Sequence, residues 1–241
     1  MSFILWLLLV GLGFFERVSA EVPGVTFYFV RHGESEANKQ GILQGQCDYP
    51  LTSLGKEQAA SVGKKLSSTS FGRVYTSDLT RARDTCGIVV GQSKVGLTPT
   101  RQTHLLREAR FGVREAFPTT NSKLDCTAII AKKLGIKEEE VVDCAESEME
   151  LHQRQQIFFH QVFDELEELE LADQPASLTD VLVVTHSHFV KAMISLATTL
   201  PQPPKIHNCS LTKICVRRCR STGRLSYSYK PEEINTPTVS E

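Results

Sequence analysis

An arginine, a histidine and a glycine stand side by side at Arg31, His32 and Gly33, directly after the apolar run Val25 to Val30. An imidazole can act as a base or a nucleophile near neutral pH, because its ordinary pKa is about 6.5. Arginine grips the oxygens of an anion with two parallel N–H donors, and glycine lets the backbone come close to it. Together the three residues predict a site that handles an anion.

Two apolar strands are expected to position this site. Val25 to Val30 is rich in β-branched and aromatic residues, as buried strands are, and Val181 to Val184 has the same character. The second run ends in Thr185 and His186. Ligands of α/β sheets bind beyond the carboxyl ends of parallel strands. We therefore expect His32 and His186 to meet at one edge of the sheet, although they lie far apart in the sequence.

Helical and extended patterns alternate along the rest of the chain. Helices are predicted from Thr52 or Ser53, over Thr80 to Val90, over Glu146 to Leu171 and over Phe189 to Thr198. Short strands are predicted over Arg73 to Ser77, Leu211 to Val216 and Leu225 to Tyr229, the last two as a hairpin with Gly223 in its turn. This alternation predicts an α/β fold, a three-layer αβα sandwich with a mostly parallel central sheet.

The overall composition limits the classes of partner. The chain has 241 residues, 41% of them hydrophobic and 23% charged, which fits one sizeable domain. A net charge of −1 gives no general attraction to nucleic acid or to anionic membranes, so an anion must be bound by local arginines. The seven cysteines form no CxxC pair of the kind that holds zinc, and their disulfide status stays open.

Both ends of the chain differ from its middle. Phe3 to Phe15 is almost continuously apolar, and Val18-Ser19-Ala20 resembles a signal-peptide cleavage site. Residues 1–20 are therefore either a signal peptide or an apolar extension of a cytosolic domain. No stable membrane span is expected, since a span needs about 20 apolar residues. Residues 231–241 are predicted to be a flexible tail, which leaves residues 25–230 as the folded domain.

Three further segments make the first motif specific. They are Ser77 to Thr85 (SDLTRARDT), Leu106 to Gly112 (LREARFG) and Thr185-His186. In this order and at these intervals, the chain resembles the histidine phosphatase superfamily, which includes the cofactor-dependent phosphoglycerate mutases and the fructose-2,6-bisphosphatases. The resemblance extends from about Val25 to Tyr229 and implies a phosphoglycerate mutase-like fold. The loop Gly41 to Gln46, followed by Pro50-Leu51, is similar to that of the fructose-2,6-bisphosphatases.

The resemblance implies catalytic roles for five residues. His32 would be the nucleophile and would form a phosphohistidine intermediate, for which its imidazole must be neutral. Arg31, Arg81 and His186 would hold the phosphoryl oxygens and stabilise their charge, with no metal or other cofactor. Glu108 would protonate the leaving alkoxide and then deprotonate the attacking water. That role requires a raised pKa, which burial or a neighbouring phosphate would give to Glu108.

The resemblance also implies substrate-binding positions at Gly33, Asn38, Gln44 and Gly45. Gly33 would let the backbone approach the phosphate, and a helix after it would offer N–H donors. A second phosphate could be bound by Arg107, Arg110 and Arg114, unless these are solvated surface charges. Glu146-Ser147 with Arg154 is similar to the family segment that helps to close the site.

Some positions depart from the family pattern. Ser187 and Ala116 stand where glycine is usual, Cys144-Ala145 replaces a glycine pair, and Ala109 replaces a polar residue. Each departure adds a Cβ or removes a polar group near the pocket. These departures leave the catalytic efficiency and the choice of substrate open, while the five catalytic residues of the family pattern are all present.

The preferred interpretation is a metal-independent phosphatase that acts on a small phosphorylated metabolite, fructose 2,6-bisphosphate, in the cytoplasm. A broad-specificity sugar or glycerate phosphatase is the nearest alternative, and a secretory location applies if residues 1–20 are a signal peptide. A metal hydrolase built on His32, His186 and His188 is disfavoured because Arg31 and Arg81 would repel a cation. A phosphate-binding regulatory module without turnover also remains, and the oligomeric state stays open.

Overall fold

The computed structural model describes residues 24–96, 98–171, 180–198, 202–219 and 221–229, so the predicted N-terminal segment 1–20 and tail 231–241 lie outside the described residues. The described strands form one sheet in the order β3-β2-β4-β1-β5-β6. Their bounds are β1 Val25–Arg31, β2 Arg73–Ser77, β3 Thr100–Thr103, β4 Asp180–Thr185, β5 Leu211–Arg218 and β6 Leu225–Tyr229. The first four in this sheet order pair in parallel, and β5 and β6 pair antiparallel. The mostly parallel sheet and the final hairpin are both confirmed.

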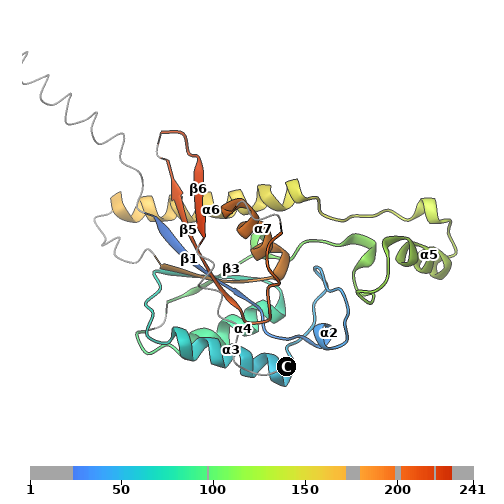
Figure 1. Cartoon of the computed structure of the whole chain (residues 1–241), viewed down its shortest axis with the longest axis horizontal. Coiled ribbons are helices and arrows are strands. Elements are labelled where there is room, and N and C mark those ends of the chain that lie inside the picture. Colours follow the sequence, from blue (N-terminus) through green and yellow to red (C-terminus); the bar gives the residue numbers. More distant parts are fainter. Residues whose placement is uncertain (1–23, 97, 172–179, 199–201, 220, 230–241) are drawn as a thin grey trace, which may run out of the picture.

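Helices cover both faces of the sheet (Figure 1). Their bounds are α2 Glu36–Lys39, α3 Ser53–Leu66, α4 Thr80–Val90, α5 Lys123–Leu134, α6 Glu148–Leu171 and α7 Ser187–Ala197, with the 3-10 turns η1 His104–Leu106, η2 Gly112–Arg114 and η3 Glu138–Glu140. Thr52 starts α3 as predicted, because its Oγ1 accepts the backbone N–H of Gly55 at 3.0 Å.

Two apolar cores fill the space between the sheet and the helices on its two faces. Alternate residues of β1 point to opposite faces, so Phe27 and Phe29 pack with α6 and α7 whereas Val30 packs with α3 and α4. The first core is aromatic: the rings of Phe27 and Phe159 meet edge to face with centroids 4.9 Å apart. These cores confirm the three-layer αβα sandwich.

Two predicted helix ends need correction. The long helix begins at Glu148 instead of Glu146, because Ser147 accepts the N–H of Glu150 at its Oγ and acts as a cap. The last helix begins at Ser187 instead of Phe189, because β4 ends at Thr185 and the chain turns directly into the helix. As a result, Ser147 caps the start of α6, and Ser187 and His188 form the first turn of α7, directly after His186.

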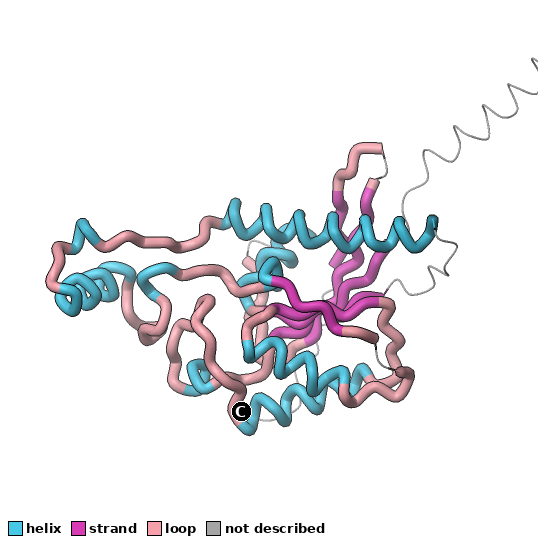
Figure 2. The backbone as a smooth tube through the Cα atoms, turned by 180° about the vertical axis from the view of Figure 1, so that it is seen from behind, coloured by secondary structure: helices cyan, strands magenta, loops and turns pink. Residues whose placement is uncertain are grey.

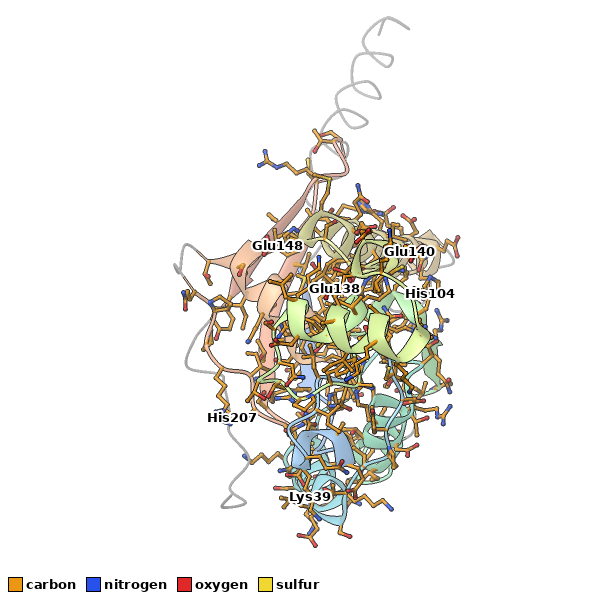
Figure 3. All side chains as sticks on the ribbon, turned by 90° about the vertical axis from the view of Figure 1, so that its right-hand side faces the viewer. Lys39, His104, Glu138, Glu140, Glu148 and His207 are labelled. Carbon is orange, nitrogen blue, oxygen red and sulfur yellow. The ribbon has the colours of Figure 1, made fainter. Side chains whose placement is uncertain are left out.

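An arm, residues 117–147, leaves the sheet and returns to α6, as both backbone views show (Figures 1 and 2). It carries α5 and η3, which the sequence patterns did not predict. Figure 3 looks onto this end of the molecule, with Glu138 and Glu140 of η3 above Lys39 of α2. No helix within the described residues is long and apolar enough to cross a membrane.

Candidate active site

His32 and His186 meet at the carboxyl edge of the sheet, as the strand pattern predicted. Arg31 at the end of β1 is in register with Thr185 at the end of β4, and the N–H of His32 donates to the carbonyl of Thr185 at 2.9 Å. The two imidazole centroids are 5.1 Å apart. Both side chains are buried, at 2% and 0% exposure, so the pair lies in a site largely removed from solvent.

The ring of His32 is oriented by its own backbone. Nδ1 lies 2.7 Å from the carbonyl oxygen of Gly33, which can only accept, so Nδ1 carries the proton and Nε2 keeps its lone pair. Burial, then the charges of Arg81 and Arg31, hold the pKa of His32 well below its usual value. His32 is therefore neutral at pH 7, the form that a nucleophile needs.

The two arginines are fixed by backbone carbonyls. Arg81 donates to the carbonyls of Cys47 at 2.8 Å and Gly45 at 2.7 Å, and Arg31 donates to that of Ile206 at 2.6 Å. Burial lowers the pKa of both guanidinium groups, yet each stays protonated at neutral pH. Their charge is thus held beside His32, where it adds to the effect of burial in lowering the pKa of that imidazole.

Several buried nitrogens here have no partner among the described residues. They are Nε of Arg31, Nε of Arg81, and both ring nitrogens of His186. Buried polar groups are rarely left unpaired, because each costs about 1–3 kcal/mol. Burial, Arg81 and His32 also hold the pKa of His186 well below its usual value. The cluster can donate several hydrogen bonds to the oxygens of one phosphoryl group.

Glu108 is buried beside these cations, at 6% exposure. Its Oε1 accepts the backbone N–H groups of Ala109 and His188, each at 3.0 Å. Burial acts to raise the pKa of Glu108, but hydrogen bonds and charge from His188 and these N–H groups outweigh it and lower that pKa. The expected raised pKa is therefore wrong for this structure.

Gly33 has a structural role in addition to the substrate-binding role that the resemblance implies. Its N–H donates to Oγ1 of Thr85 at 3.0 Å, so that donor is already used. A Cβ on Gly33 would lie 2.3 Å from the carbonyl oxygen of Gly55, at the start of α3. The glycine is required for this backbone contact, and the helix that follows, α2, is only four residues long.

The other three predicted pocket residues build the loop around the nucleophile. Oγ of Ser35 lies 3.0 Å from Oδ1 of Asn38 and 2.8 Å from Oε1 of Gln44, so its one proton is donated to either of these oxygens. Gly45 has a positive φ of 53°, and a Cβ there would lie 2.0 Å from Oε1 of Glu115. Asn38, Gln44 and Gly45 thus lie in the loop that follows His32, where the side-chain oxygens of Asn38 and Gln44 contact Ser35.

The sequence patterns did not predict the role of the segment Asn208-Cys209, which binds the backbone of the predicted nucleophile. Asn208 donates its side-chain amide to the carbonyl of His32 at 3.0 Å and to Oδ1 of Asn38 at 3.3 Å. The next residue, Cys209, has a positive φ of 53° and donates its N–H to the carbonyl of Arg31 at 3.0 Å. Burial raises the pKa of the Cys209 thiol to about 12. No local pattern signalled this role, because the contacts join distant parts of the chain.

The three arginines considered for a second phosphate differ in how they are held. Arg107 donates to both oxygens of Asp78, at 2.7 and 2.6 Å, which commits its guanidinium. Arg110 is half-exposed and lies 4.0 Å from a carboxylate oxygen of Glu150. Nε of Arg114 is buried without a partner among the described residues. Arg107 therefore forms a structural ion pair with Asp78. The side chains of Arg110 and Arg114 are less constrained.

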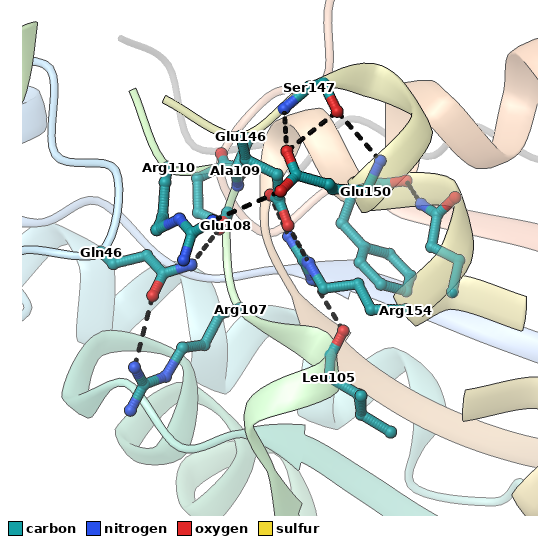
Figure 4. A network of polar contacts seen from close by, with 12 residues as sticks. Gln46, Leu105, Arg107, Glu108, Ala109, Arg110, Glu146, Ser147, Glu150 and Arg154 are labelled. Carbon is teal, nitrogen blue, oxygen red and sulfur yellow. Dashed lines mark hydrogen bonds and ion pairs between the residues drawn. The ribbon is translucent and has the colours of Figure 1, made fainter. Parts of the chain in front are cut away.

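The end of the arm is tied to α6 by an ion pair (Figure 4). Arg154 donates to both carboxylate oxygens of Glu146, at 2.7 and 2.9 Å, and to the carbonyl of Leu105 at 2.7 Å. The N–H of Glu146 in turn donates to the carbonyl of Arg110 at 2.8 Å. This contact joins the arm to the segment that carries Glu108.

The residues of the metal-hydrolase hypothesis do not form an extended triad. His188 lies in the first turn of α7, beside Glu108 in space although no carboxylate is near it in the sequence. Within the part of the chain that the structure describes, no three His, Cys, Asp or Glu side chains are grouped as metal ligands.

This fold and site agree with one family. The chain belongs to the histidine phosphatase superfamily (branch 1), whose family model matches residues 27–226.

Individual relatives match shorter or more divergent stretches. The fructose-2,6-bisphosphatase TIGAR of Xenopus tropicalis is 38% identical over 108 residues, 44% of this chain and 38% of that protein. A broad-specificity phosphatase of Saccharomyces cerevisiae is 38% identical over 101 residues, 41% of this chain and 44% of that protein. The chain thus spans less than half the length of these two relatives. A probable phosphoglycerate mutase of Salmonella choleraesuis is 28% identical over 198 residues, 78% of this chain and 83% of that protein.

Solved structures confirm the phosphoglycerate mutase-like fold. The crystal structure of phosphoglycerate mutase from Bacillus anthracis is 26% identical, with a TM-score of 0.65, and covers 89% of this chain and 94% of that chain. A mycobacterial glucosyl-3-phosphoglycerate phosphatase in complex with VO3 is 20% identical, with a TM-score of 0.65, and covers 88% and 100% of the two chains. The second likeness is one of fold alone.

Proposed function

We propose that this protein is a metal-independent phosphatase that hydrolyses a phosphomonoester through a phosphohistidine on His32. One observation carries the proposal: a neutral, oriented imidazole lies beside buried arginine and histidine nitrogens that have no partner among the described residues. Arg31, Arg81 and His186 would bind the phosphoryl oxygens and stabilise their charge in the transition state. Glu108 would handle the proton of the leaving and attacking oxygens.

The reaction would proceed in two steps on the same phosphorus atom. In the first, Nε2 of His32 attacks phosphorus, the bond to the ester oxygen breaks, and Glu108 protonates the leaving alkoxide. In the second, water attacks phosphorus, the N–P bond breaks, and Glu108 takes the proton of the water. Throughout, Nδ1 of His32 keeps its hydrogen bond to Gly33, which holds the ring in line for both displacements.

The substrate that we propose is fructose 2,6-bisphosphate, and the partial likeness to TIGAR supports it. The equally partial likeness to a broad-specificity phosphatase supports the second candidate, a sugar or glycerate phosphatase of wide range. The half-exposed Arg110 is available for a second anionic group, whereas the Asp78 pair occupies Arg107. Cytoplasmic action, inferred from the family, belongs to the same proposal and is tested by cell fractionation of the full chain.

The experiment is phosphate release by the full chain in excess EDTA. kcat/KM would be compared for fructose 2,6-bisphosphate, 2,3-bisphosphoglycerate, phosphoenolpyruvate and simple phosphate esters. A preference for the first supports the narrow function, and flat activity supports the broad one. Loss of activity in EDTA contradicts the metal-independent mechanism.

Matched variants test the nucleophile. His32→Ala should abolish turnover and the acid-labile phosphoenzyme trapped from labelled substrate, while His160→Ala, on α6, should leave both unchanged. Full activity of His32→Ala would overturn the mechanism. A wild type that binds phosphate but turns over no ester would instead establish the regulatory-module alternative.

A further inference from the structure

A third histidine, His188, lies outside the family motif and contacts the buried carboxylate of Glu108. Its oxygens accept the backbone N–H of His188 at 3.0 and 3.3 Å, and Oε2 lies 3.5 Å from Nδ1 of the same residue. We propose that His188 is a positioning residue that shares a proton with Glu108, so that the two groups act as one acid–base pair. The inference rests on the proposed function, because it assigns the source of the proton for that reaction.

The pair resolves a conflict within the site. A sugar alkoxide leaves only when an acid protonates it, yet the donors around Glu108 lower its pKa and favour the carboxylate at neutral pH. Imidazole is the side chain that gains and loses its charge between pH 5 and 8. A histidine in contact with the carboxylate therefore supplies the proton that Glu108 alone would lack.

The protons balance over the two steps of the reaction. The pair holds one shared proton, on His188 while Glu108 is a carboxylate. In the first step this proton passes from Nδ1 of His188 through Glu108 to the leaving oxygen, as the P–O bond breaks and the N–P bond forms on His32, which leaves a carboxylate and a neutral imidazole. In the second, the attacking water gives its proton to Glu108, which returns it to Nδ1 of His188 as the N–P bond breaks. The pair ends in its starting state, and no other proton donor is needed.

His188 is also placed to exchange protons with solvent. Its side chain is 45% exposed, whereas that of Glu108 is 8% exposed, so the imidazole connects a buried carboxylate to the surface. The ring packs edge to face on Phe111, with centroids 4.7 Å apart, which limits its rotation. The contact keeps Nδ1 turned toward the carboxylate.

Other charged groups surround the pair on both sides. A cavity of about 330 Å³ lies at the outer side of His188, and the further titratable or charged residues in its lining are Arg110, Glu146, Glu148, His152 and Lys191. The charge of Glu146 is neutralised by Arg154. On the inner side, Glu108 faces the charges of Arg31 and Arg81. Among the described residues, none of these five cavity residues has a hydrogen bond or ion pair with Glu108. His188 is therefore the residue of this cavity that can exchange a proton with Glu108.

The test is His188→Gln, which keeps the backbone N–H that binds Glu108 and removes the titrating ring. Phosphorylation of His32 would be followed in a single turnover, between pH 5.5 and 8.5, with an alkyl phosphate and with 4-nitrophenyl phosphate. The alkyl ester should react about tenfold or more slowly at pH 7.5, because its leaving group needs the acid. The nitrophenyl ester, whose leaving group needs no proton, should slow less than about threefold.

The pH profile gives an independent readout. In the wild type the acid form of the pair is lost as the imidazole deprotonates. In His188→Gln the acid is the carboxyl of Glu108 alone, and carboxyls lose their proton at lower pH than imidazoles. The alkaline limb for the alkyl ester should therefore move to lower pH. His152→Gln, in the same cavity but away from Glu108, should keep the wild-type profile.

The outcomes separate this inference from the function on which it rests. An active wild type with an unchanged His188→Gln profile overturns the pair alone. So does an equal slowing of both esters, which is the result expected of a purely structural role. A wild type that is inactive on every ester overturns the proposed function and the pair with it.

Discussion

Asn208 donates its side-chain amide to the carbonyl oxygen of His32 at 3.0 Å, although 176 residues separate them in the sequence. The N–H of Cys209 fixes the preceding carbonyl, that of Arg31, at 3.0 Å. On the other side, the ring of His32 is fixed by Gly33. The orientation of the imidazole thus depends on backbone contacts from a distant loop as well as on its own motif.

Asn208→Ala should lower kcat/KM without unfolding the protein. A hydrogen bond of this kind contributes about 1 kcal/mol, which corresponds to a fall of about fivefold when it is lost from the reactive geometry. Steady-state kinetics with 4-nitrophenyl phosphate, together with a thermal melt, measures both effects. Asn121→Ala, in the arm, is the control that should match the wild type. Unchanged kinetics in Asn208→Ala would show that this contact does not position His32.

Ala116→Gly should stabilise the fold. Ala116 has a φ of 65°, a left-handed conformation that costs an L-residue with a Cβ about 1–2 kcal/mol and costs glycine little. The free energy of unfolding in urea should therefore rise by about 1 kcal/mol, net of the greater freedom of glycine in the unfolded chain. Ala128→Gly, inside α5, should lower it by about the same amount. A loss of stability in both variants would contradict the strain at position 116.

The layers of the fold could be predicted because their signals are local. Apolar runs and caps fixed β1, β4, α3 and α4, and the order of strands and helices fixed the parallel sheet. The edge strand β3, with sequence TRQT, carries no apolar pattern and was missed. Helix α5 was missed although Ser122, Asp125 and Gly135 supply its caps, because few of its residues are buried.

The candidate site could be predicted only in part, for the same physical reason. The strand ends were enough to bring His32 and His186 together. The pKa of Glu108 could not be foreseen, because His188 reaches it through folding and not through sequence spacing. Gly33 was expected to face a phosphate, whereas its contact with Gly55 is visible only once α3 is packed in place.

Gly33→Ala should destabilise the protein and disturb the nucleophile together. Its new Cβ would lie 2.3 Å from the backbone oxygen of Gly55, so the loop that carries His32 must shift. Overpacking of this kind costs about 1–3 kcal/mol. Gly87→Ala is the matched control, because a Cβ there meets nothing within 4 Å and alanine favours the interior of α4. The free energy of unfolding in urea and kcat/KM should both fall in Gly33→Ala, and neither should fall in Gly87→Ala. A Gly33→Ala protein as stable and active as wild type would refute the contact.

Stability should fall as the pH drops below about 6.5, the ordinary histidine pKa. Burial first, then the charge of Arg81, holds the pKa of both His32 and His186 well below that value. Below this pH the two histidines are protonated in the unfolded chain but stay neutral in the folded chain. The free energy of unfolding therefore rises with pH, and the contribution of the two histidines to stability is complete above the unfolded pKa. The slope should reach up to about 1.4 kcal/mol per pH unit for each histidine.

Urea unfolding at intervals between pH 5 and 7.5 measures this slope, above the range where most carboxylates titrate. His186→Asn should reduce it by about half, because one of two buried imidazoles is removed. His160→Asn, on α6 and outside the candidate site, is the matched control and should leave the slope unchanged. A wild-type stability that stays flat down to pH 5 would mean that both imidazoles accept protons in the folded site. In that case burial and the charges of Arg31 and Arg81 would not lower the pKa of His32 in the folded site.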